Sequence, residues 1–205
     1  RAFLGEAFDV EKHFTPSYRP WQQRLAFVPD GDLFQGIAAG KASVVTDEID
    51  TFTETGVRTK SGEQLDADII ITATGFNLCM FGDIDFDVDG EPVDFADTVT
   101  WRGMMFTGVP NMLWVFGYLR TSWTMRADLI SDFVCKLLEH MDDKGVDVVT
   151  PTLRPDEQDM TRRNWVSEEN FNAGYLLRGM HLLPKQGTKL PWLHTQDYYF
   201  DKEDI

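Results

Sequence analysis

The sequence predicts an α/β protein, and two features of the chain predict it. Residues 66–76 read Asp-Ala-Asp-Ile-Ile-Ile-Thr-Ala-Thr-Gly-Phe, three isoleucines followed by small residues and a glycine. An apolar run of β-branched residues is typical of a strand buried on both faces, as in a parallel sheet. Between residues 122 and 145, apolar residues recur at the spacing of an amphipathic helix. A strand–hairpin–strand layout before residue 72 favours the end of a nucleotide-binding domain.

Several short elements are expected before that strand. Residues 14–21 contain two prolines and three aromatic residues, which predicts an ordered but irregular loop. Residues 33–39 are expected to form a short helix, because acidic residues precede them and a glycine follows. A brief strand is expected at 43–46, and an antiparallel pair at 49–53 and 57–59.

The second half is expected to contain more helix. Residues 86–93 carry an Asp-Gly turn and predict a hairpin. Residues 112–116 are apolar and end at a glycine, which predicts a second buried strand. The helix from 122 to 145 presents its apolar stripe to the core and not to a cofactor. A second amphipathic helix is expected at about 156–171, followed by a tail on the surface.

Composition excludes several classes of function. The 205 residues can bury one good core or two small ones. The net charge of −15 disfavours nucleic acid and anionic membranes as partners. No apolar run is long enough to span a bilayer, and the four histidines lack the spacing of metal ligands. The two cysteines, Cys79 and Cys135, are expected to be reduced, buried thiols of a cytoplasmic protein.

Short blocks in a fixed order resemble one enzyme family. Residues 14–34 include Phe-Thr-Pro-x-Tyr-x-Pro-Trp-x-Gln-Arg-Leu, residues 73–75 are Ala-Thr-Gly, and residues 108–112 are Gly-Val-Pro-Asn-Met. These blocks, and Leu-Pro-Lys-Gln-Gly at 183–187, resemble flavin-containing and Baeyer–Villiger monooxygenases, in particular the bacterial ethionamide-activating subgroup. The resemblance covers nearly the whole chain.

The resemblance implies a domain layout. In that family, the segment matching 73–75 links an NADP-binding domain back to an FAD-binding domain. We therefore expect residues 1–72 to be the C-terminal part of the NADP-binding domain, residues 73–150 the C-terminal part of the FAD-binding domain, and residues 151–205 a helical and extended tail. The glycine-rich loops that hold the pyrophosphate groups of FAD and NADP are absent from the sequence. Because the chain starts at Arg1, we expect it to begin inside a longer protein.

The resemblance also implies a reaction and site residues. The family uses FAD, NADPH and O₂ to form a peroxyflavin, which inserts or transfers one oxygen atom to a ketone or a soft heteroatom. Arg24 matches the active-site arginine of the family, and a permanently charged guanidinium suits a developing negative charge. The competing interpretation is a surface arginine paired with a carboxylate. The residues expected at the cofactors are Thr74, Gly75, Thr121, Ser122, Thr124 and Met125.

Other assignments stay open at this level. Trp101, Met104 and Tyr175 are candidates for a substrate pocket, although aromatic and methionine side chains are more often core. The expected partners are a small-molecule substrate and O₂, with a possible homo-oligomer, and the chain alone is expected to be inactive. An alternative is a truncated, cofactor-free binding or interaction domain. A disulfide-reductase type of flavoprotein is disfavoured, because no closely spaced cysteine pair is present.

Overall fold

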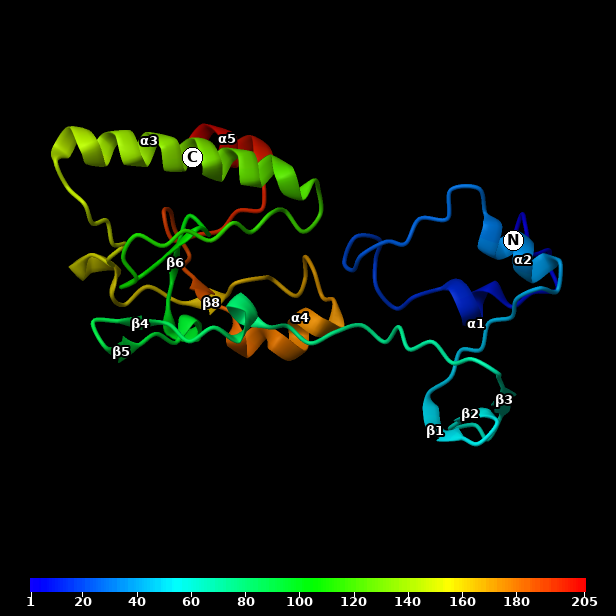
Figure 1. Cartoon of the computed structure of the whole chain (residues 1–205). Helices are drawn as coiled ribbons and strands as arrows, with labels where there is room; N and C mark the ends of the chain where they lie inside the picture. Colours follow the sequence, from blue (N-terminus) through cyan, green and yellow to red (C-terminus); the bar gives the residue numbers. More distant parts are fainter. The chain divides into compact units, whose positions relative to one another are not determined.

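The computed structural model describes all residues, 1–205, and the chain forms two compact units (Figure 1). Unit 1 is Arg1–Gly75 and unit 2 is Phe76–Ile205. The division lies close to the boundary expected at residue 72. The boundary expected between residues 73–150 and 151–205 falls inside unit 2. The assignment of these parts to NADP- and FAD-binding domains stays a prediction.

Unit 1 contains two short helices and a three-stranded sheet. The helices are α1 (Val10–Phe14) and α2 (Asp32–Ala38), and the strands are β1 (Ile49–Thr53), β2 (Gly56–Thr59) and β3 (Gln64–Asp66). The sheet is antiparallel in the order β1-β2-β3, so the predicted hairpin is confirmed. The predicted helix α2 is confirmed too, but Gly31 is its N-cap and no acidic side chain caps it.

The predicted strand at 69–72 is wrong. These residues join no sheet, and Ile69 and Ile71 are 80 % and 84 % exposed. A strand buried on both faces needs neighbouring strands and covering layers, because its backbone groups and both rows of side chains must leave water together. The sheet of unit 1 ends at β3 and supplies none of these. The predicted strand at 43–46 is absent for the same reason, since no strand pairs with it.

Unit 2 is organised around one long helix and three two-stranded sheets. The helix α3 (Trp123–Lys144) is confirmed, with Gly145 as its left-handed C-cap. Two of the sheets are hairpins, β4 (Asp87–Val88) with β5 (Glu91–Pro92) and β6 (Thr100–Trp101) with β7 (Met105–Phe106), and the third pairs the more distant β8 (Arg163–Asn164) and β9 (Lys185–Gln186). The remaining elements are η1 (Met80–Asp83), η2 (Phe95–Asp97), η3 (Pro155–Glu157), α4 (Gly174–Gly179), η4 (Met180–Leu182) and α5 (Tyr198–Asp204). Helix α5 packs beside α3 (Figure 1).

Two further predictions for unit 2 are wrong. Residues 112–116 are in no strand, and the amide of Trp114 donates to the carbonyl of Met104 at 2.7 Å. Residues 156–171 form no α-helix; Trp165, Val166 and Phe171 are instead all buried in one core cluster. In a helix these three positions would point in widely different directions, so they could not share one core.

The core of unit 2 consists of three clusters. One surrounds Trp165, one is built from Phe95, Phe106 and Val109, and one packs Met104 and Met105 against α3. The fold is thus a mixture of helices and small sheets. Every named strand pairs antiparallel. The expected α/β class is therefore confirmed only in that the chain contains both helices and strands, because no two named strands pair in parallel.

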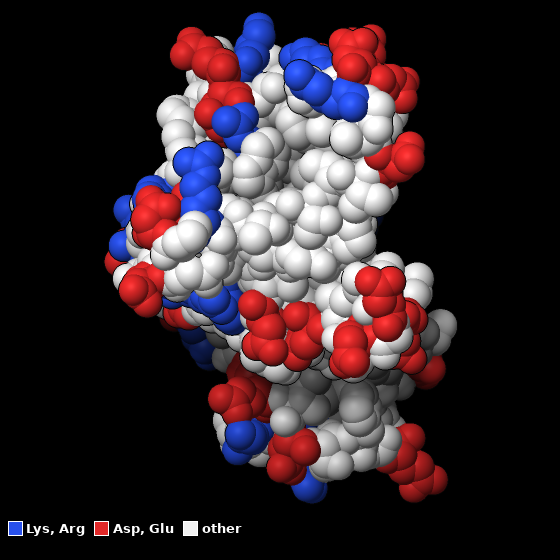
Figure 2. Space-filling model, turned by 90° about the vertical axis from the view of Figure 1, so that its left-hand side faces the viewer, with Lys and Arg blue, Asp and Glu red and all other residues white.

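The surface reflects the acidic composition. On the face drawn in Figure 2, acidic and basic side chains are interspersed around an area without charged residues. Cys79 and Cys135 are free, as expected, but both are exposed. Their expected burial is wrong, because α3 turns Cys135 outward, away from the face on which Ile130 is buried.

Candidate functional site

The start of α3 presents unsatisfied backbone donors. Ser122 is the N-cap residue, yet its side chain accepts no backbone hydrogen bond. Its hydroxyl oxygen lies instead 2.9 Å from that of Thr124. The first amides of a helix have no partner within the helix, and the helix dipole adds partial positive charge there. The exposed first turn of this 22-residue helix is therefore suited to an acceptor or an anionic group.

The preceding loop, residues 117–122, lies directly against this first turn. A Cβ added at Gly117 would lie 2.3 Å from Cδ2 and 2.7 Å from Cα of Trp123. No other residue fits there without moving the helix start. The ring of Trp123 also packs against Phe116, with ring centroids 4.7 Å apart. The position of the loop and that of the helix start are thus coupled.

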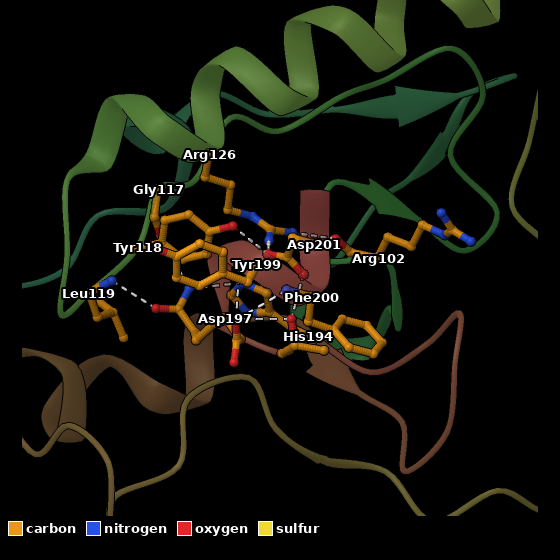
Figure 3. Close-up of polar contacts among 12 residues, drawn as sticks. Arg102, Gly117, Tyr118, Leu119, Arg126, His194, Asp197, Tyr199, Phe200 and Asp201 are labelled. Atoms are coloured by element: carbon orange, nitrogen blue, oxygen red, sulfur yellow. Dashed lines mark hydrogen bonds and ion pairs between the residues drawn. The ribbon is translucent and has the colours of Figure 1, made fainter. Parts of the chain in front are cut away.

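A buried ion pair lies beneath the loop (Figure 3). The guanidinium of Arg126, in the first turns of α3, pairs with Asp201 of α5, and both side chains are buried. The hydroxyls of Tyr118 and Thr195 also donate to Asp201, the former at 2.7 Å. A second Arg126 nitrogen donates to the carbonyl oxygen of Arg102 at 2.5 Å. Burial, together with Asp201, raises the pKa of the Tyr118 phenol, which therefore stays protonated.

Gln196 attaches the C-terminal segment to the backbone of the loop. Its side-chain oxygen accepts the amide of Leu119 at 2.7 Å, and its side-chain nitrogen donates to the carbonyl of Gly117 at 3.3 Å. The same nitrogen lies 2.9 Å from Nε2 of His194. Because the amide oxygen is already used by Leu119, Nε2 of His194 is the acceptor and Nδ1 carries the hydrogen.

His194 is held neutral within the core. Its ring stacks on Trp165 with centroids 4.2 Å apart. Burial, and then the charge of Arg126, lower the pKa of His194 well below its usual value. Nδ1 of His194 is buried without a hydrogen-bond partner.

The predicted cofactor-binding residues fall into two places. Thr121, Ser122, Thr124 and Met125 gather at the start of α3, where only Met125 is partly buried. Thr74 is exposed at the end of unit 1, next to Gly75, whose φ is +88. A positive φ is a conformation that glycine adopts readily, but residues 71–79 form no turn, so the sharp turn predicted from the small residues is not seen.

Arg24 lies in unit 1, in an exposed stretch between α1 and α2 without regular secondary structure. It forms no ion pair, so the surface pairing that competed with a catalytic role is not seen. Its role at the active site stays a prediction.

The three candidates for a substrate pocket do not line one cavity. Trp101 packs against Phe133 and borders a mostly apolar cavity of about 320 Å³. Tyr175 packs against Phe76 and belongs to a different cluster. Met104 is fully buried, which favours the core alternative for that residue.

Sequence reasoning missed the buried polar residues. Arg126 lies four positions before Ile130, in register with the apolar stripe of α3. A charged residue in that register predicts a buried ion pair, so this signal was available. No such signal marks Asp201 or Gln196, whose partners are distant in the sequence.

Other kinds of site find no support in the structure. None of the helices has the length and apolar character needed to cross a membrane. No three His, Cys, Asp or Glu side chains are grouped so that they could hold a metal ion.

Comparison with known proteins gives a consistent answer. The chain is 50% identical over 198 residues to the FAD-containing monooxygenase EthA of Mycolicibacterium smegmatis, covering 97% of this chain and 39% of EthA. It is 43% identical to AlmA of Acinetobacter baylyi, described as an FAD-binding monooxygenase, over 100% of this chain and 42% of AlmA. It is also 43% identical to MymA of Mycobacterium tuberculosis, described as FAD-containing, over 98% of this chain and 40% of MymA.

No family model and no solved structure matches the chain. The chain spans about two fifths of the length of the curated relatives that it matches. Its sequence thus corresponds to a partial chain of the EthA, AlmA and MymA subgroup of FAD-containing monooxygenases.

Proposed function

We propose that this chain is the C-terminal portion of an FAD- and NADPH-dependent monooxygenase of the Baeyer–Villiger type. The whole protein inserts or transfers one oxygen atom from O₂ to a ketone or a soft heteroatom. The observation that carries this proposal is the 50% identity with EthA, which extends along 97% of the chain. An identity this high is expected to preserve the roles of individual residues as well as the fold.

The start of α3 fits the ring end of FAD. FAD, when bound, supplies the capacity to accept a hydride from NADPH and to activate O₂. The amides of the first turn of α3 have no side-chain acceptor, so they can stabilise negative charge on a reduced ring. Thr121, Ser122 and Thr124 add exposed hydroxyl groups at the same place. The pyrophosphate has no matching loop here, because the sequence lacks a Gly-x-Gly-x-x-Gly segment.

Arg24 and residues 74–75 complete the proposed set. The exposed guanidinium of Arg24 is free to donate to a negative charge that develops during oxygen transfer, and to NADPH. Gly75 has no side chain and no neighbouring atom within 4 Å of where a Cβ would lie, so a cofactor can approach its backbone closely.

Flavin content tests the proposal. The full-length protein should be yellow and retain one FAD through gel filtration, and it should oxidise NADPH and form an oxygenated product from a ketone or a sulfide. The 205-residue chain by itself should show only protein absorbance, because it lacks the pyrophosphate-binding loops. A full-length protein that retains no flavin would overturn the proposal and favour a cofactor-free binding domain.

A further inference from the structure

The C-terminal segment, residues 194–201, contacts the loop 117–122 from far away in the sequence. Gln196 bonds the backbone on both sides of Tyr118, across 77 and 79 residues of chain. The side chain of Tyr118 reaches Asp201 in the same segment. Asp201 in turn holds Arg126 of α3. The loop and the helix start are therefore tied to one segment through backbone, side chain and ion pair.

We propose that Gln196 is a positioning residue that sets the loop 117–122, and with it the first turn of α3, against the flavin. This inference rests on the proposed function, because it assumes that the helix start faces FAD. Gln196 contacts no reacting group itself. It acts through the backbone of Gly117 and Leu119, which it holds at a fixed distance from the C-terminal segment.

The local geometry supports this role. Gln196 adopts a left-handed backbone with φ of +56, which non-glycine residues rarely populate. That backbone is retained where surrounding contacts define it, and here the side-chain amide makes three contacts. The Leu119 amide can only donate, so it fixes which side-chain atom of Gln196 is the oxygen, and the amide nitrogen then faces Nε2 of His194, whose ring stacks on Trp165. The orientation of Gln196 is thus fixed by the loop on one side and by the core on the other.

Coupling to the helix follows from the tight contact at Gly117. The space beside its Cα is already occupied by Trp123, the first residue of α3. A shift of the loop toward the helix therefore displaces Trp123, and with it the first-turn amides. Loss of the Gln196 contacts frees the loop to make such shifts.

The test compares Gln196→Leu with a matched control, Gln186→Leu, in the full-length protein. Gln186 is buried, whereas Gln196 is partly buried, and the Gln186 amide likewise accepts one backbone N–H, from His194, while it donates to the carbonyls of Asn164 and Trp165. It contacts no residue of the loop 117–122. Both variants lose a side-chain amide that bonds the backbone and His194, but only Gln196 bonds the loop directly.

Amide hydrogen exchange gives the first readout, and it does not require flavin. In Gln196→Leu, exchange at Leu119 should accelerate roughly three- to tenfold, the effect of losing one hydrogen bond. In Gln186→Leu, exchange at Leu119 should stay near wild type. Equal exchange in the two variants would overturn the inference, whatever the flavin does.

The flavin gives the second readout. At a fixed redox poise, the ratio of reduced to oxidised flavin in Gln196→Leu should fall roughly two- to fivefold, the range of a helix-terminus interaction. The control should keep the wild-type ratio. Faster exchange with an unchanged flavin ratio would overturn the positioning role toward FAD. That result would still support the attachment of the loop to Gln196. A full-length protein without flavin would instead refute the proposed function.

Gln196→Glu serves if the leucine variant fails to fold. The carboxylate keeps an acceptor for the Leu119 amide but loses the donor to the Gly117 carbonyl. The added negative charge also disfavours a reduced, negatively charged flavin, so the flavin ratio should fall at least as far as in Gln196→Leu. An unchanged or opposite ratio would overturn the inference.

Discussion

Asp201→Asn should destabilise unit 2 strongly while changing its shape very little. Asp201 is 4% exposed and accepts hydrogen bonds from Tyr118, Arg126 and Thr195. Asparagine has the same outline, and its carbonyl oxygen can still accept from Tyr118 and Arg126. The substitution therefore removes the negative charge and leaves most of the hydrogen bonds in place.

The cost follows from the burial of Arg126, which is 1% exposed. A guanidinium does not deprotonate in proteins, so its charge remains after the partner is lost. Breaking a buried ion pair by removing one member costs about 3–5 kcal/mol. The carbonyl of Arg102 and the ring of Tyr118, 5.6 Å away, still stabilise the cation and favour the lower end of that range. Typical domains are stable by only about 5–15 kcal/mol, so the loss is large.

Urea unfolding of the 205-residue chain, followed by tryptophan fluorescence, measures this cost. Five of the six tryptophans lie in unit 2, so the signal reports mainly on that unit. Asp204→Asn is the matched control, because Asp204 is on the same helix and pairs with Arg102 at 3.1 Å. Both of those side chains are 22% exposed, so the control should lose only about 1 kcal/mol or less.

The double variant Arg126→Met, Asp201→Leu separates charge from packing. It leaves no buried charge, so it should recover most of the stability that Asp201→Asn loses. The reasoning is refuted if Asp201→Asn loses no more free energy of unfolding than Asp204→Asn. A double variant as unstable as Asp201→Asn would show that packing, and not charge, sets the cost.

Three further predictions address the site. In the full-length protein, Arg24→Ala should keep its fold and FAD but form oxygenated product roughly 10²–10³-fold more slowly, with less product per NADPH oxidised, and a near-normal rate would favour the interpretation of Arg24 as a surface arginine. Gly117→Ala should displace Trp123 and lower the thermal midpoint of the chain, because the added Cβ would lie 2.3 Å from the ring; an unchanged midpoint would contradict this. Burial depresses the pKa of His194 in the folded chain, so below about pH 6.5 the unfolded chain binds a proton at His194 that the folded chain does not. The free energy of unfolding should therefore fall as the pH drops, by up to about 1.4 kcal/mol per pH unit. Urea titrations from pH 7.5 to 5.5 should show that His194→Gln reduces this dependence while the exposed His140→Gln keeps it.

Local signals predicted the elements that depend on local interactions. The helix α3 follows from its own apolar spacing and its terminal Gly145. The β1–β2 and β4–β5 hairpins follow from turn residues next to their strands. In each case the groups that form the hydrogen bonds lie close together in the sequence. The resemblance to a monooxygenase family was likewise readable from short blocks, and the relatives confirm it.

Elements that depend on distant partners were not predictable in this way. Residues 69–72 have the composition of a buried strand, but no strand of unit 1 pairs with them. Residues 156–171 gave a helical pattern, yet Trp165 is buried in the aromatic core beside Phe116 and His194. Burial in a shared core removes a large apolar area from water. This stabilises the chain more than a weak helical propensity does.

The sequence by itself determined the family, the long helix, the β1–β2 and β4–β5 hairpins and the polar residues at the start of α3. Only the tertiary structure showed that Gln196 and Asp201 hold the loop before that helix. An amide or a carboxylate looks the same in the sequence whether water or a buried backbone group is its partner. Folding decides between them, because a buried polar group must find its partner within the protein, and that partner lies more than 70 residues away.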